Sequence, residues 1–146
     1  MKHSSNPGAG KVLKSLLSTL VILAFTAFVP QTGTIPGELE KAFTLAKGAR
    51  QATELIIDTP GILKAEAEWE PQSAELGLIL FGPGQMNYYV RKDGTSPQKL
   101  EYEITEHDLK EGNTWKISVV NMLTDKVTGK VRINYPTPPV GATIGK

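Results

Sequence analysis

The chain has 146 residues, of which 40% are apolar and 21% charged, and it contains no cysteine. This excludes disulfide frameworks, thiolate metal sites and cysteine nucleophiles. The net charge of +1 is unevenly spread: three of the 16 Lys/Arg lie in an N-terminal segment without acids, which leaves 13 against 15 Asp/Glu from Pro30 onward. No basic patch stands out, so nucleic acid is not expected as a partner.

The first 29 residues have the pattern of an export signal. Residues 1–15 are polar and basic, and the next fourteen, Leu16 to Val29, carry no charge. A basic stretch followed by an apolar one is typical of a secretory signal, whereas a membrane-spanning helix needs about 20 apolar residues. Residues 1–29 are therefore predicted to be a signal peptide or a short membrane anchor. The protein is then secreted, periplasmic or on the cell surface.

Residues 30–41 are predicted to be a linker or a short helix, with PGELEKAF (36–43) as the helical candidate. From residue 42 to 136 the hydrophobic pattern has period 2. It is clearest in residues 62–70, where Leu63, Ala65, Ala67 and Trp69 alternate with charged residues. Such alternation predicts a strand with one buried and one solvated face. Further strands are predicted at 42–46, 52–58, 76–81, 87–91, 99–105, 114–120 and 130–135.

Turn residues separate these segments at intervals of roughly ten residues. The pattern predicts an all-β fold, an antiparallel sandwich of about 7–8 strands, Ig-like or jelly-roll-like. One helical turn capped by Thr105 is expected at 105–110. Residues 137–146, TPPVGATIGK, are predicted to be a Pro/Gly-rich flexible tail.

The stretch LGLILFGPG (76–84) is apolar on both faces, with Leu76, Leu78 and Leu80 on one side and Ile79 and Phe81 on the other. This predicts a central strand that is covered on both sides. The Gly-Pro-Gly that follows lacks the lysine of a phosphate-binding loop, so it is predicted to be a turn. The outward side of Ile79 and Phe81 is a candidate contact with another chain.

The sequence offers little for catalysis or metal binding. His107 lies in a polar turn, and no serine has the G-x-S-x-G context, so no catalytic residue is assigned and an enzyme is not expected. No D-x-D-x-D-G run is present, and no cofactor is predicted. Trp69 and Trp115 lie on inward faces and are expected in the core. Tyr88 and Tyr89 are adjacent, so one ring must face away from the core, where it could hold a sugar or a protein.

The order of these elements resembles the bacterial pre-peptidase C-terminal (PPC) domain group and similar small secreted β-sandwiches. The segments that carry the resemblance are FTLAKGARQATELIIDTPGILKAEAEW, AELGLILFGPG, SPQKLEYEIT, GNTWKISVVN and GKVRINYP. The resemblance implies an accessory, adhesive or substrate-binding module. Calcium-binding members tend to have A-D-L-D-L where this chain has Ala74-Glu75-Leu76-Gly77-Leu78, which leaves Glu75 as a weak calcium candidate.

The resulting hypothesis is an exported, non-enzymatic sandwich that acts as a binding or assembly module. Its partner would be another protein, a second copy of itself or a surface polysaccharide. Self-association is expected to use strand addition by the terminal segments, because an exposed sheet edge needs only backbone hydrogen bonds. The alternative function is a carbohydrate-binding module or an accessory domain of an extracellular enzyme system, based on Tyr88 and Tyr89.

Overall fold

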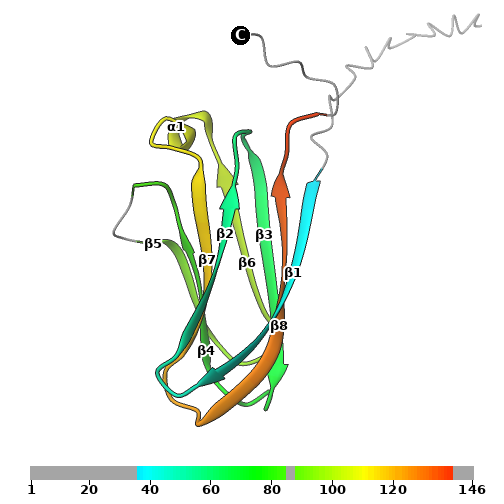
Figure 1. Cartoon of the computed structure of the whole chain (residues 1–146), viewed down its shortest axis with the longest axis vertical. Helices are drawn as coiled ribbons and strands as arrows, with labels where there is room; N and C mark the ends of the chain where they lie inside the picture. Colours follow the sequence, from blue (N-terminus) through cyan, green and yellow to red (C-terminus); the bar gives the residue numbers. More distant parts are fainter. Residues whose placement is uncertain (1–35, 85–87, 140–146) are drawn as a thin grey trace, which may run out of the picture. The chain divides into compact units, whose positions relative to one another are not determined.

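A computed structural model describes residues 36–84 and 88–139, and these residues form two packed antiparallel sheets (Figure 1). The predicted export segment and most of the predicted C-terminal tail lie outside the described residues. Within those residues, no helix combines the length and the apolar character that crossing a membrane would require.

Eight strands and one short helix make up the fold. Their bounds are β1 Pro36–Ala46, β2 Arg50–Ile56, β3 Gly61–Glu70, β4 Leu76–Phe81, β5 Tyr88–Gly94, β6 Gln98–Ile104, α1 Glu106–Leu109, β7 Thr114–Asn121 and β8 Lys126–Pro136. The first sheet has the order β1-β8-β3-β6 and the second β2-β7-β4-β5.

This order is that of a jelly roll. Successive strands alternate between the two sheets, apart from β4 and β5, which pair within one sheet. Eight strands in two sheets with such crossovers define the jelly-roll architecture. The predicted all-β sandwich is confirmed, and of the two topologies considered it is the jelly-roll one.

Alternation places the core between the sheets. In β3, Leu63, Ala65, Ala67 and Trp69 are at most 3% exposed, while the charged residues between them are exposed. Trp115 on β7 is fully buried, so both tryptophans belong to the core as expected. The apolar faces of the two sheets bury each other, which is the main favourable contribution to a fold without disulfides.

The start of the domain differs from the prediction. Residues 36–43 form most of β1 instead of a linker or helix, and β1 pairs with β8 from Pro36↔Pro136 to Ala46↔Lys126. Leu39 and Phe43 are four residues apart, a spacing that suits one face of a helix and also one face of a strand. The segment forms a strand because all eleven residues of β1 have a cross-strand partner on β8, and this pairing satisfies the backbone hydrogen-bonding groups of β1 on that side.

The predicted helical turn is confirmed, and its cap is complete. The Thr105 hydroxyl oxygen accepts a hydrogen bond from the Asp108 backbone N–H at 3.3 Å, and Asp108 Oδ2 accepts one from the Thr105 backbone N–H at 2.8 Å. Two donors at the start of a helix are thereby satisfied reciprocally. The turn holds α1 at the end of the sandwich, between β6 and β7.

Gly129 marks the closest approach inside the first sheet. It lies on β8 directly between Phe43 of β1 and Trp69 of β3. A Cβ at this position would lie 2.7 Å from Phe43 Cζ and 2.7 Å from Trp69 Cβ, and it would also meet the Glu68 carbonyl. Only a residue without a side chain leaves room for both rings.

We therefore expect Gly129→Ala to lower the free energy of unfolding by about 1–3 kcal/mol, the usual cost of overpacking a core. Urea unfolding followed by tryptophan fluorescence measures this. Gly77→Ala on β4 is the matched control, because its Cβ would meet chiefly the exposed Asp93 carboxylate, at 3.0 Å. Equal effects of the two substitutions would contradict the packing assigned to Gly129.

Candidate functional site

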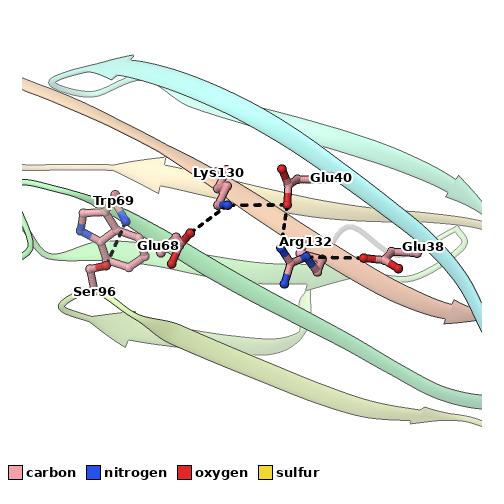
Figure 2. A network of polar contacts seen from close by, with 7 residues as sticks. All are labelled: Glu38, Glu40, Glu68, Trp69, Ser96, Lys130 and Arg132. Carbon is pink, nitrogen blue, oxygen red and sulfur yellow. Dashed lines mark hydrogen bonds and ion pairs between the residues drawn. The ribbon is translucent and has the colours of Figure 1, made fainter.

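The outer face of the β1-β8-β3-β6 sheet is covered by cross-strand ion pairs. Lys130 Nζ lies 3.1 Å from Glu68 and 3.8 Å from Glu40, and Arg132 reaches Glu40 at 3.0 Å and Glu38 at 3.5 Å (Figure 2). The pattern continues to β6 through Lys64–Glu101 at 3.1 Å and Lys99–Glu66 at 2.9 Å. Opposite charges thus face one another on all four strands.

These pairs describe a solvated face. The paired side chains are 43–70% exposed, and exposed pairs contribute little to stability. The Lys99 ammonium lowers the pKa of Glu66 through a hydrogen bond, which keeps that carboxylate ionised. Glu66 therefore lacks the raised pKa that a general acid needs.

A hollow of about 670 Å³ borders this charged face where β3 and β8 meet the loops at residues 71–75 and 95–97. Trp69 contributes to its wall, and the Trp69 backbone N–H donates a 2.9 Å hydrogen bond to the Ser96 hydroxyl (Figure 2). The Trp69 ring itself is 3% exposed, and its Nε1–H donates to the Ala74 carbonyl at 2.9 Å. The indole is thus a structural part of the wall and is not available for stacking.

The outer face of the other sheet has a different character. Its outward positions on the central strand β4 are Gly77, Ile79 and Phe81, and they lie beside Val120, Ser118 and Lys116 of β7, respectively. A hollow of about 410 Å³ lies here, lined by Arg50, Ala52, Phe81, Gly82, Gly84, Thr114, Lys116 and Ser118. Small and apolar residues occupy the centre of this face, beside Lys116 and a single ion pair, Arg91–Asp93, whereas cross-strand ion pairs cover the opposite face.

The four predicted binding residues lie on or near this second face. Ile79 and Phe81 point outward from a central strand, as expected, but Ile79 is only 6% exposed and Phe81 is half-buried. Arg91 of β5 and Ser118 of β7 flank Ile79 directly. Ile79 therefore does not offer the open apolar surface that was expected of it, because its own neighbours cover it. A binding role for these residues stays a prediction.

Tyr88 and Tyr89 face opposite ways, as their adjacency predicts. Tyr88 is 54% exposed and lies opposite Phe81, while Tyr89 packs on the core. The Tyr89 ring contacts those of Tyr102 and Trp115, with centroids 5.3 Å away in both cases. Gly82 makes room for the Tyr89 ring, since a Cβ at residue 82 would overlap it. Of the two tyrosines, Tyr88 is the one that can meet a ligand.

Tyr88 borders a third hollow of about 390 Å³, together with Tyr89, His107, Asp108 and Glu111. His107 and Glu111 are exposed, and Asp108 is 8% exposed and held by Thr105. An aromatic ring beside carboxylate and imidazole groups is a setting in which sugar hydroxyls can find partners. The tyrosine pair and the helical turn are both predicted from the sequence, but their meeting at one hollow is not.

The Tyr102 phenol lies behind the same hollow. Its pKa is raised to about 12, chiefly because burial disfavours the phenolate and also because the Asp108 carboxylate repels it. The Tyr102 hydroxyl lies 3.4 Å from Asp108 Oδ1, to which it donates. The phenol proton of Tyr102 thus forms a hydrogen bond that connects β6 to α1.

Metal binding has little support in the described part of the chain. Glu75, the weak calcium candidate, is exposed. Within residues 36–84 and 88–139, no group of three or more His, Cys, Asp or Glu side chains is placed to hold an ion. Calcium prefers six to eight oxygen ligands, so the Glu75 carboxylate alone does not define a site.

The structure also reveals an exposed apolar pair that the sequence pattern did not predict. Met122 and Leu123 are 56% and 66% exposed at the turn between β7 and β8. The turn is held by the buried Asn121, whose Nδ2 donates to Leu45 O at 3.1 Å and to Thr124 O at 2.7 Å. The sequence signal for this exposed pair is two apolar residues within a segment of turn-forming residues, NMLTD (121–125).

No family model matches the chain, and no curated protein matches it. Among solved structures, a Yersinia pseudotuberculosis-derived mitogen is 18% identical with a TM-score of 0.50, covering 71% of this chain and 88% of the mitogen. A periplasmic inhibitor of g-type lysozyme from Aeromonas hydrophila is 14% identical (TM-score 0.44; 70% and 87% covered), and a chain from Bacillus endospore appendages, which form pili, is 6% identical (TM-score 0.39; 70% and 89% covered). At these identities, the likeness to the mitogen concerns the fold alone. Membership of the PPC group stays a prediction.

The raised pKa of Tyr102 predicts a loss of stability in alkali. The folded state retains the proton up to about pH 12, whereas an unfolded tyrosine loses it near pH 10. The unfolded state therefore binds fewer protons in this window, and stability falls as the pH rises from 10 to 12. We expect Tyr102→Phe to reduce this fall in urea unfolding midpoints. Tyr88→Phe, which leaves the buried phenol in place, should retain it, and a fall of equal size in both variants would contradict the assignment.

Proposed function

We propose that this chain is an exported, non-enzymatic jelly-roll module that binds a protein partner or a second copy of itself. It would act outside the cytoplasm, as a secreted, periplasmic or cell-surface protein, in the manner of the PPC-like sandwiches that its sequence resembles. The proposal assigns no catalytic residue and no cofactor.

The difference between the two outer faces carries this proposal. On the β1-β8-β3-β6 face the charges already pair with one another across the strands. On the other face, Ile56 and Tyr88 are 56% and 54% exposed. Thr114, Lys116 and Phe81 lie between them, and the small and apolar row of Ala52, Ser118 and Ile79 follows along the strands. Apolar surface that is rimmed by polar residues is typical of a protein contact.

Charges placed on this face should therefore weaken assembly. We expect the full chain to form species larger than the monomer as its concentration rises. The double variant Ile56→Glu/Tyr88→Glu should raise the dissociation constant at least about tenfold, because a carboxylate in an apolar contact loses its hydration. Light scattering coupled to size-exclusion chromatography measures both.

Ile62→Glu is the matched control for this experiment. Ile62 is 43% exposed on the outside of β3, on the charged face, so the same substitution there should leave association unchanged. Two results would contradict self-association through this face: a monodisperse monomer at every concentration with both ends intact, or equal weakening by the control and by the double variant.

The hollow beside α1 supports a second candidate function, carbohydrate binding. The exposed Tyr88 ring lies there with His107 and Glu111, and half-exposed aromatic rings commonly stack on sugars. This candidate needs no assembly, and it shares Tyr88 with the protein contact proposed above.

For this candidate, Tyr88→Ala should abolish retention on insoluble cellulose, chitin or peptidoglycan, while Tyr88→Phe should keep it. The Tyr89 ring is left in place, because it packs on Tyr102 and Trp115 and its removal would disturb the core. Thermal unfolding of each variant checks the fold. Unchanged retention of the Tyr88→Ala variant would refute the carbohydrate function.

A further inference from the structure

The jelly roll has two seams at which the edge strands of its sheets face each other. One lies between β5 and β6, and the other between β1 and β2. At each seam the backbone groups that point away from the sheet lack a neighbouring strand. How the side chains fill a seam decides whether another strand can enter.

Aromatic rings fill the seam between β5 and β6. Tyr89 of β5 meets Tyr102 of β6 edge to face, with centroids 5.3 Å apart, and both lie against Trp115. No extended segment can enter between these strands without displacing the rings.

The seam between β1 and β2 is bridged at one point and hollow beyond it. Gln51 Nε2 of β2 donates a 3.0 Å hydrogen bond to the Ala42 carbonyl of β1. Next to this bridge lies a hollow of about 470 Å³, lined by Leu39, Lys41, Gln51, Ala52, Thr53 and Glu54. Leu39 is partly buried against the core, so an apolar side chain that entered here would extend the core.

Hydrogen bonds at both ends of β2 show which of its backbone groups face the seam. Asn121 N–H donates to Ala49 O, and Ile57 N–H donates to Asn113 O, both at 2.9 Å. In an antiparallel pair, alternate residues direct their backbone groups to the same neighbour. The odd-numbered residues of β2 therefore bond β7, and Ala52 and Glu54 present their N–H and C=O groups to the seam. Within residues 36–84 and 88–139, these two residues have no hydrogen bond on that side.

The two edges of the seam are not equivalent. On β1, the Ala42 carbonyl is occupied by Gln51, and the Ala46 carbonyl accepts from Ala49 N–H at 3.0 Å. Lys41 also stands at an inward-facing position between Leu39 and Phe43, and an inward-pointing charge is a common protection of an edge strand. The edge of β2 carries no such protection at Ala52, so β2 is the edge that can accept a strand.

We propose that residues 140–146 of one copy of this chain add as an extended strand to the open edge of β2 in a second copy. This inference rests on the proposed function and names the segment that would mediate assembly. Main-chain hydrogen bonds to Ala52 and Glu54 would hold the strand, and one row of its side chains would enter the hollow beside Leu39.

The sequence of this segment fits the site. VGATIGK has the length of β2, seven residues, and it contains no proline. Val140, Ala142 and Ile144 alternate with Gly141, Thr143 and Gly145, so one face of a strand would be apolar and the other small. No charge precedes Lys146, so the segment places no ionised side chain of its own beside Lys41 and Glu54 in the hollow.

Two prolines favour a second copy over the same chain as the acceptor. Thr137 lies beside Gly37 at the end of the first sheet, and Pro138 and Pro139 follow it. Consecutive prolines hold the backbone in an extended, stiff conformation. A tight reversal into the seam of the same molecule is thereby disfavoured relative to delivery to a neighbour.

Because the chain has no cysteine, disulfide trapping in the full chain tests this directly. Copies with Ala52→Cys are mixed with copies in which one residue from 140 to 144 is replaced by cysteine, and the mixture is oxidised. Non-reducing electrophoresis measures the mixed dimers. We expect yields that alternate along the segment, at least about fivefold higher at every second position, because residues opposite each other in a ladder share a face. Glu103→Cys, an exposed position on the edge strand β6, is the control and should give no alternation.

A second variant removes one backbone hydrogen-bond donor from the open edge of β2. Ala52→Pro deletes an N–H that faces the seam and leaves the pairing with β7 intact, which edge strands tolerate. It should weaken self-association at least about tenfold, whereas Ala52→Ser should not. Thermal unfolding confirms that each variant is folded.

Three results would overturn the strand-addition proposal: equal yields at all five positions, disulfides that form within one dilute chain carrying both cysteines, or self-association unaffected by Ala52→Pro. If the chain still assembles and Ile56→Glu/Tyr88→Glu abolishes that assembly, the proposed function stands and the role of residues 140–146 falls. If the chain remains monomeric throughout, both fall.

Discussion

The contact on which the rest of the structure depends is the aromatic cluster of Trp115, Tyr89 and Tyr102. It joins β7 of one sheet to β6 of the other and fills the seam beside β5. Trp115 is fully buried, and its indole N–H has no acceptor among the described residues, so that packing and not hydrogen bonding holds the ring. Several nearby features serve this cluster. Gly82 leaves room for Tyr89, and the capped turn of α1 brings the Asp108 carboxylate to the Tyr102 hydroxyl.

Closure of one seam by aromatic rings leaves the molecule asymmetric. The opposite seam has a single side-chain bridge, from Gln51 to Ala42, and a hollow beyond it. The faces also differ: cross-strand ion pairs cover all four strands of one sheet, whereas the other has small or apolar residues at its centre and one ion pair, Arg91–Asp93, beside them. Both differences concern strands β2 and β7. The side of the molecule that carries these strands therefore offers both an apolar face and an unpaired edge, and the proposals for its partner rest on these two features.

The sequence predicted the faces of the strands better than their neighbours. Alternation identified Leu63 to Trp69 and the β6 and β7 faces, and the Thr105 cap was visible as a local motif. Strand order depends on contacts between distant segments, which periodicity does not contain. For the same reason the start of β1 was mistaken for a helix or linker, since the partner that makes it a strand lies 90 residues or so further along the chain.

The candidate sites show the same division. Adjacency alone predicted that Tyr88 and Tyr89 would part, and the structure assigns the exposed position to Tyr88. The burial of Ile79 could not be predicted, because it depends on which residues of β5 and β7 flank it. The open seam had no sequence signal either. The unpaired backbone groups of Ala52 and Glu54 are recognised only once it is known that the odd-numbered residues of β2 bond β7.

Amide hydrogen exchange at Ala52 and Glu54 in the full chain, measured at several protein concentrations, tests the central claim most directly. In the dilute protein both amides should exchange rapidly, while those of Thr53 and Leu55, which bond β7, should be protected. As the concentration rises, the account predicts protection of Ala52 and Glu54, because a strand from another copy covers them. Protection already present at the lowest concentration would mean that the chain closes its own seam, and rapid exchange at every concentration would mean that nothing enters it; either result would contradict the account.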